Sequence, residues 1–358
     1  MSDTTPFEPG TFSRRQWLGG AAALAATFLA RPAFAAGPNV GKGRVMLVEH
    51  SKATLDASKL DDAVVKQMVA EGLKAFTGEA TAAAALGRFF KANQKIAIKV
   101  NALGNGQGNV GSAVSPQVAL ALAGHLVELG VKKSNIRIFD QYMDRMKKAG
   151  YRHQKPEDGI WVTGHEGPDA NPVIYDDNGY KVTFHWAKSQ VWADAVLNLC
   201  VPKDHNLTGV TGALKNMSLG VVRPTPAGEK QPNGYTVVPR FHRNNCDPAI
   251  AKLYAMPMIK DKVKLIVCDA TRVLYQGGPQ DNPRNRVQNN QLYVTTDPVA
   301  MDVLIHELVN KHRVAKGLPK VEDATPRPRA PKFIQTAAKM GLGEGDRAKI
   351  VVDTKKLG

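Results

Sequence analysis

The residues best suited to chemistry lie between positions 202 and 216 of this 358-residue chain. Lys203 and Lys215 are cations that can bind an anion through charge-assisted hydrogen bonds, and His205 can transfer a proton near neutral pH. We therefore predict that His205 and Lys215 are catalytic. The same stretch supplies the predicted substrate-binding residues Lys203, Thr208, Gly209, Thr211 and Asn216.

This stretch follows an apolar strand predicted at residues 195–199 and opens a predicted helix. Free N–H groups at the start of a helix favour a bound anion. A capped, solvated loop without a ligand is the alternative. The concentration of glycines and hydrogen-bonding groups beside a buried strand favours the ligand site.

Two further polar residues, Lys99 and Asn101, end a strand predicted at residues 95–100. Asn101 offers both a donor and an acceptor, and the glycines at 104–111 permit close approach of the backbone to a ligand. A flexible connection is the alternative. We predict that Lys99 and Asn101 bind substrate from a neighbouring strand end.

An acidic group follows later in the chain. Asp269 ends a strand predicted at residues 263–268, where it could orient a base or bind a metal, and we predict that it is catalytic. Asp297 precedes Pro298, which is the pattern of a helix N-cap. Ligands of open α/β sheets bind beside the strand ends, so these groups are expected at one edge of the sheet.

Several familiar sites are missing from the sequence. There is no phosphate-binding G-x-x-x-x-G-K-[ST] loop, no G-x-S-x-G elbow, and Asn310 interrupts a zinc motif that would begin at His306. The three cysteines, Cys200, Cys246 and Cys268, are too few for an iron–sulfur cluster, so we expect none; buried, inert thiols are favoured. No metal-ligand set is predicted, and the cofactor is left unidentified, with a metal an open alternative.

Alternating strand and helix patterns predict an α/β fold with a mostly parallel sheet and flanking helices. Predicted strands lie at residues 44–49, 95–100, 136–139, 195–199 and 263–268, and a polar loop is expected at 276–290. A turn at Asp177–Gly179 between apolar runs predicts a β-rich insertion at about residues 151–190. We expect a single domain at residues 36–358.

The first 35 residues are typical of a twin-arginine export signal. Arg14 and Arg15 precede an apolar run at residues 17–30, which is too short to span a membrane, and an A-x-A cleavage site ends at Ala35. An uncleaved amphipathic anchor is the alternative. We expect a periplasmic protein that meets the twin-arginine translocase during export and has no stable membrane span after cleavage.

The formal net charge of +16 favours anionic partners. The sequence has neither a tight run of basic residues nor interleaved stacking aromatics, so we expect no nucleic acid as a partner. A small anionic ligand, such as a carboxylate, phosphate or sulfate, fits the lysine-rich stretch best.

The motifs together resemble a family known as the domain of unknown function numbered 362. The resemblance rests on the K-x-N strand end, the K-x-H-x-x-x-T-G-x-T-x-x-x-K-N run, Asp269 with the later G-G-P, T-D-P-V-A-x-D at residues 296–302, and G-L-G near position 343. It covers nearly all of the chain after the signal. Some members carry ferredoxin-type cysteines, which this chain lacks.

A more distant resemblance is to the nickel-pincer lactate racemases, whose loop reads roughly H-x-x-x-G-x-S-G-x-x-K. His205, Gly209, Thr211, Gly212 and Lys215 fall at similar spacing. In that family the lysine carries the cofactor and the histidine acts in proton transfer. This sequence has Gln231 where a nickel-binding histidine would lie, so the resemblance implies a shared site for a small carboxylate rather than the nickel cofactor.

Taken together, the residues predict an exported enzyme that performs acid/base chemistry on a small anionic substrate, as an isomerase, a racemase or another acid/base enzyme. The competing class is a non-catalytic binding or accessory protein for a redox or metal-maturation partner. A binding protein needs the anion site but no group that changes its protonation, so His205 distinguishes the two classes.

Overall fold

The computed structural model describes residues 40–55, 59–103, 111–223 and 237–358. The predicted export signal and most of the glycine-rich stretch at 104–111 lie outside the described residues. Within the described part, no helix is both long and apolar enough to cross a bilayer.

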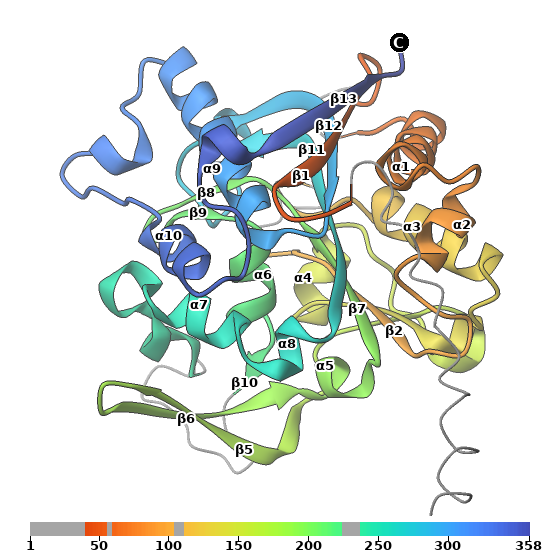
Figure 1. Cartoon of the computed structure of the whole chain (residues 1–358), viewed down its shortest axis with the longest axis horizontal. Coiled ribbons are helices and arrows are strands. Elements are labelled where there is room, and N and C mark those ends of the chain that lie inside the picture. The colour runs from red at the N-terminus through yellow and green to blue at the C-terminus, as the bar shows by residue number, and fades with distance from the viewer. Residues whose placement is uncertain (1–39, 56–58, 104–110, 224–236) are drawn as a thin grey trace, which may run out of the picture. The chain divides into compact units, whose positions relative to one another are not determined.

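A mixed, mostly parallel ten-stranded sheet forms the centre of the described chain (Figure 1). Its main path runs β13-β1-β12-β11-β7-β2-β3-β4; off this path β8 pairs with β11, and β9 pairs with β8. The strands are β1 (Arg44–Glu49), β2 (Ile96–Lys99), β3 (Ile136–Phe139), β4 (Trp161–Thr163), β7 (Ala195–Cys200), β8 (Lys203–His205), β9 (Gly209–Thr211), β11 (Val263–Leu274), β12 (Arg286–Thr295) and β13 (Val351–Lys356).

Helices cover both faces of this sheet, as Figure 1 shows. One face carries α1 (Asp62–Thr77), α2 (Ala82–Gly87) and α3 (Pro116–Glu128), and the other carries α6 (Ala213–Ser218), α7 (Ala249–Tyr254), α9 (Pro298–Ala315) and α10 (Lys332–Lys339). Shorter helices are α4 (Met143–Lys148), α5 (Lys188–Trp192) and α8 (Pro257–Lys260). The predicted α/β fold is confirmed.

Strands β2 and β7 are buried on both faces, which explains why their sequences are mostly apolar, with Lys99 and Asn198 as the exceptions. Successive side chains point to opposite faces. Ala97 and Val196 accordingly pack into the core beneath α6, α7 and α9, whereas Ile98 and Leu197 pack into the core beneath α1, α2 and α3. All three cysteines are buried free thiols, as predicted.

Side-chain caps set the ends of two long helices. Asp61 Oδ1 accepts hydrogen bonds from the N–H groups of Ala63 and Val64 at the start of α1. Asp297 Oδ1 accepts from Val299 and Ala300, both at 2.9 Å, at the start of α9. The prediction that Asp297 is an N-cap is therefore confirmed.

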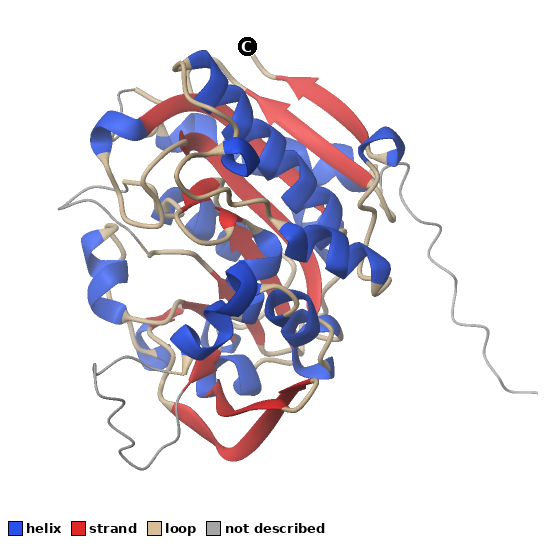
Figure 2. Ribbon diagram, turned by 90° about the vertical axis from the view of Figure 1, so that its left-hand side faces the viewer, coloured by secondary structure: helices blue, strands red, loops and turns tan. Residues whose placement is uncertain are grey.

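The predicted β-rich insertion contains a hairpin of β5 (Pro168–Asp177) and β6 (Tyr180–Ala187). Asn178 and Gly179 both have positive φ, at 51° and 85°, as a tight hairpin turn requires. Together with β10 (Val222–Arg223) the hairpin forms a separate antiparallel sheet, which lies at the bottom of Figure 2.

Two boundaries differ from the sequence-based prediction. Strand β11 continues past Asp269 to Leu274, and the predicted loop at 276–290 gives way to β12 from Arg286 onward. The two strands pair in antiparallel fashion, with a register shift between Ala270 and Arg272. Pairing with a neighbouring strand satisfies the backbone of these polar segments, an effect that local composition does not reveal.

Candidate active site

A cavity of about 210 Å³ lies beside the carboxyl ends of β2 and β3. From β2 the chain continues to β3 and β4 on one side, whereas the later strands β7 and β11 are placed on the other. A reversal of this kind is where open α/β sheets bind ligands. Six of the predicted site residues line the cavity, namely Lys99, Asn101, His205, Thr211, Lys215 and Asn216.

Lys99 is held in place by three acceptors. Its Nζ donates to Asp140 Oδ1 at 2.7 Å, to Asn216 Oδ1 at 2.9 Å and to the Val100 carbonyl at 2.7 Å. Burial lowers the pKa of Lys99, and Asp140 offsets part of this effect. All three ammonium protons are used, so Lys99 organises the site rather than offering a free charge to a ligand.

Asn216 connects this lysine to the neighbouring strand. Its Nδ2 donates to Asn198 Oδ1 on β7 at 2.8 Å, and Asn198 Nδ2 donates to the Ala213 carbonyl at 3.0 Å. The buried amides thus attach α6 to the sheet. Because Lys215 is the residue before Asn216, the same contacts fix where the Lys215 side chain begins.

Lys203 was predicted to bind substrate, but it is not among the residues that line the cavity. Its Nζ donates to Asn101 Oδ1 at 2.9 Å and to the Leu103 carbonyl, and its side chain is fully buried behind the cavity wall. Burial lowers the pKa of Lys203 to about 7. Lys203 therefore acts on the cavity through Asn101 and through its charge.

Lys215 is the cation that faces the cavity without a partner. Its side chain is 8% exposed, and no hydrogen bond or ion pair joins its ammonium group to any described residue. Burial lowers the pKa of Lys215, and Lys99 lowers it further. The Thr211 hydroxyl nearby is also buried without a partner in the described chain. Both groups are free to bind a ligand.

His205 is fixed by the turn between β8 and β9. Its Nδ1 accepts hydrogen bonds from the N–H groups of Leu207 at 3.1 Å and Thr208 at 3.3 Å. Burial lowers the pKa of His205 well below its ordinary value, and Lys215 adds to this. The imidazole is consequently neutral at physiological pH.

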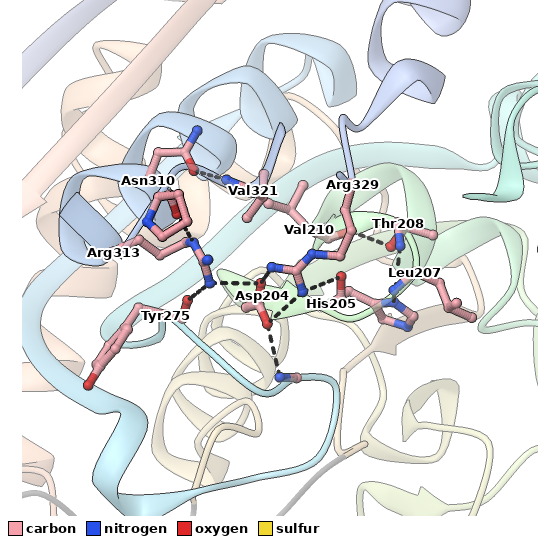
Figure 3. Close-up of polar contacts among 12 residues, drawn as sticks. Asp204, His205, Leu207, Thr208, Val210, Tyr275, Asn310, Arg313, Val321 and Arg329 are labelled. Carbon is pink, nitrogen blue, oxygen red and sulfur yellow. Dashed lines mark hydrogen bonds and ion pairs between the residues drawn. The ribbon is translucent and has the colours of Figure 1, made fainter. Parts of the chain in front are cut away.

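Asp204 anchors β8 from behind, as Figure 3 shows. Its carboxylate pairs with Arg329 at 3.1 Å and Arg313 at 3.6 Å and accepts a hydrogen bond from the Gly278 N–H at 3.2 Å. Arg329 also donates to the His205 carbonyl at 3.4 Å. This buried cluster positions the strand that carries His205.

The start of α6 is not open to a ligand, contrary to the sequence-based expectation. The N–H groups of Ala213 and Leu214 donate to the Asp302 carboxylate at 2.5 Å and 3.2 Å. Burial raises the pKa of Asp302 to about 7, and the two hydrogen bonds oppose this. A carboxylate of the protein itself thus occupies the position expected for the anion.

Three other predicted residues lie outside the cavity lining. Asp269 accepts hydrogen bonds from Ser115 and Thr271 through its two oxygens and pairs with Arg272 at 3.6 Å, which is a structural set of contacts. Thr208 Oγ1 donates to the Val210 carbonyl at 2.9 Å. Gly209 has φ of 79° and packs against the Arg329 backbone, where a Cβ would clash.

The sequence-based reasoning missed His242, Asp140, Tyr142 and Arg145, which also line the cavity. Asp140 directly follows β3, so the rule that placed Lys99 at a strand end could have found it. His242 lies in the short helix η3 (Val238–Cys246), with no motif around it. Its Nδ1 donates to the Val238 carbonyl at 2.9 Å, and its ring stacks at 6.3 Å on that of His205.

Among the described residues, no group of three or more His, Cys, Asp or Glu side chains is arranged to hold a metal ion. Gln231, where the nickel-pincer resemblance would place a ligand, lies outside the described residues.

The fold and the cavity define an α/β protein with its candidate site at a reversal of strand order. The chain belongs to the family described as a domain of unknown function (DUF362), whose sequence profile matches residues 96–307. This family was predicted from the sequence motifs and is confirmed. No curated protein matches the chain.

One similar solved structure is the lactate racemase apoprotein from Thermoanaerobacterium thermosaccharolyticum. The sequences are 13% identical and the TM-score is 0.41, over 76% of this chain and 58% of that chain. This chain therefore spans less than two thirds of the length of that structure.

Proposed function

We propose that the protein is an enzyme that binds a small anionic substrate in this cavity and acts on it by acid/base chemistry. The observation that carries the proposal is the buried ammonium group of Lys215, which has no partner in the described chain and faces the cavity beside His205. An unpaired buried charge is costly, and an anionic ligand would offset that cost.

The surroundings of Lys215 favour an anion over a cation. Asp140 is the carboxylate among the described lining residues, and Lys99 neutralises it at 2.7 Å. Lys215 and Arg145 add positive charge to the same cavity. The cavity is smaller than the roughly 300–1,000 Å³ of most ligand pockets, which favours a small carboxylate, phosphate or sulfate.

A thermal-shift screen tests the proposal. Acetate, phosphate and sulfate are each titrated into the chain that begins at Ala36, because an anion that binds only the folded state raises the melting temperature. At least one should stabilise the wild type, and Lys215→Met should remove the response. Lys132→Met, which removes an exposed lysine, is the control. An equal response in all three proteins would contradict the proposal.

His205→Gln separates an enzyme from a binding protein once the stabilising anion has led to a substrate. The variant of an enzyme should retain affinity and lose turnover, whereas a binding or accessory protein has no turnover to lose.

We further propose export to the periplasm through the twin-arginine pathway, for which the support is the sequence of residues 1–35 alone.

A further inference from the structure

The two histidines of the cavity differ in whether the ring nitrogen Nε2 carries a proton or a lone pair. His205 Nδ1 accepts two backbone N–H groups, so in the neutral ring the proton is on Nε2. His242 Nδ1 donates to the Val238 carbonyl, so in the neutral ring Nε2 carries a lone pair. Neither Nε2 has a hydrogen-bond partner among the described residues.

These contacts give the histidines opposite roles. We propose that His242 is the general base of the cavity, that His205 is a neutral hydrogen-bond donor, and that the substrate is a small anion with a C–H bond beside a carbonyl group. The inference rests on the proposed function, because Lys215 must hold the anion beside the two rings.

The proposed step needs no other reactant. His242 Nε2 takes the proton from carbon, the C–H electron pair becomes the C=C bond of an enolate, and the carbonyl π electrons move onto oxygen. The His205 Nε2–H and the Lys215 ammonium stabilise this oxyanion. Return of a proton from His242 to the same face of that carbon closes the cycle as an exchange of this hydrogen with solvent, and return to an adjacent carbon completes an isomerisation. His205 never has to become an anion in either case.

Charges around His242 make its basicity depend on the ligand. Burial and the charge of Lys215 together lower the pKa of His242 to about 4, and the hydrogen bond to the Val238 carbonyl opposes them. The other charged or titratable groups among the described lining residues are Lys99 with Asp140, Tyr142, Arg145 and His205. A bound anion offsets Lys215 and raises the pKa of His242 toward the range in which a base is effective.

Alkylation of the histidines tests this assignment without knowledge of the substrate. Iodoacetate alkylates an unprotonated ring nitrogen, forming an N–C bond and releasing iodide, and its carboxylate suits the Lys215 site. Mass spectrometry of peptides should find His242 carboxymethylated faster than the exposed His153, and His205 unmodified. Modification of His205 instead of His242, or a His242 rate no higher than that of His153, would overturn the proposal.

Neutral iodoacetamide separates this inference from the anion site. Lys215→Met should slow the reaction of His242 with iodoacetate by about 10- to 150-fold, the loss of one charge-assisted hydrogen bond, and leave the iodoacetamide rate little changed. If His242 reacts rapidly but equally with both reagents, and Lys215→Met changes neither rate, the base is supported and the anion site fails.

Nitrogen NMR of histidine-labelled protein at pH 7 gives a second readout, with His205→Gln and His242→Gln to assign the resonances. Two-bond proton–nitrogen spectra should give the Nδ1–H tautomer for His242 and the Nε2–H tautomer for His205. An Nε2–H tautomer or a doubly protonated ring at His242 would contradict the assignment.

Discussion

Two buried lysines illustrate how environment decides the role of a residue. Lys99 has three acceptors within 2.9 Å, including the Asp140 carboxylate. Lys215 has no partner among the described residues although it is almost as deeply buried. The first lysine holds β2, β3 and α6 together, whereas the second is available to a ligand.

Replacing each lysine with methionine should therefore change stability in opposite directions. Lys99→Met leaves the buried Asp140 carboxylate without its cation and should lower the free energy of unfolding by about 3–5 kcal/mol. Lys215→Met removes an unpaired buried ammonium and should raise it by about 1–3 kcal/mol in the absence of anions. Urea unfolding measures both values.

Lys132→Met, at an exposed position, should leave the unfolding midpoint nearly unchanged and is the matched control. If Lys215→Met proved as destabilising as Lys99→Met, Lys215 would have a structural role that the described contacts do not account for.

The sequence predicted part of this constellation. Lys99, Asn101, His205, Thr211, Lys215 and Asn216 could be identified because they follow predicted strands or share one short motif. The burial of Lys203 and the contacts of Asp269 depend on which strands become neighbours, which local sequence does not specify. His242 enters the cavity from a segment with no motif, so only the tertiary fold reveals it.

At the scale of elements, the site depends on how α6 is attached. This helix has six residues, too few to be stable alone, so its position depends on tertiary contacts. Asp302 on α9 accepts the N–H groups of Ala213 and Leu214, and Gly212 leaves room for that carboxylate, since a Cβ there would clash with it.

Asp302→Ala should consequently destabilise the protein and displace Lys215. Two buried N–H donors would lose their acceptor, which should lower the free energy of unfolding by about 2–4 kcal/mol. Asp302→Asn keeps one acceptor oxygen and should cost less. Thermal unfolding compares the variants, and an Asp302→Ala protein as stable as the wild type would contradict this role.

Elements with a local signal were predicted well. β1 has the bounds predicted for it, residues 44–49, and Asn178–Gly179 forms the expected hairpin turn. The extension of β11 and the start of β12 were missed, because polar residues are held there by pairing between the strands. Long-range pairing between strands is the part of the fold that local composition does not predict.

At the scale of the whole molecule, the central proposal is compatible with the excess of positive charge, formally +16. Such a charge raises the local concentration of anions around the protein. The sequence also predicts where the protein would meet them, since residues 1–35 carry the pattern of an export signal.

Export is tested by Arg14→Lys/Arg15→Lys in the full chain. The arginine pair is read by the translocation machinery, so the variant precursor should stay in the cytoplasm while the wild type is found in the periplasm with a new N-terminus near Ala36. Fractionation and N-terminal sequencing report both results. Normal amounts of processed variant in the periplasm would contradict the proposal.

Calorimetric titration tests the central claim most directly, that Lys215 makes this cavity a site for a small anion. Acetate, phosphate and sulfate are titrated into the wild type, Lys215→Met and the Lys132→Met control. We predict that the tightest of the three binds at one site and that Lys215→Met weakens it by about 10- to 150-fold, with Lys132→Met unchanged. Equal affinities in all three proteins, or no binding to the wild type, would contradict the account.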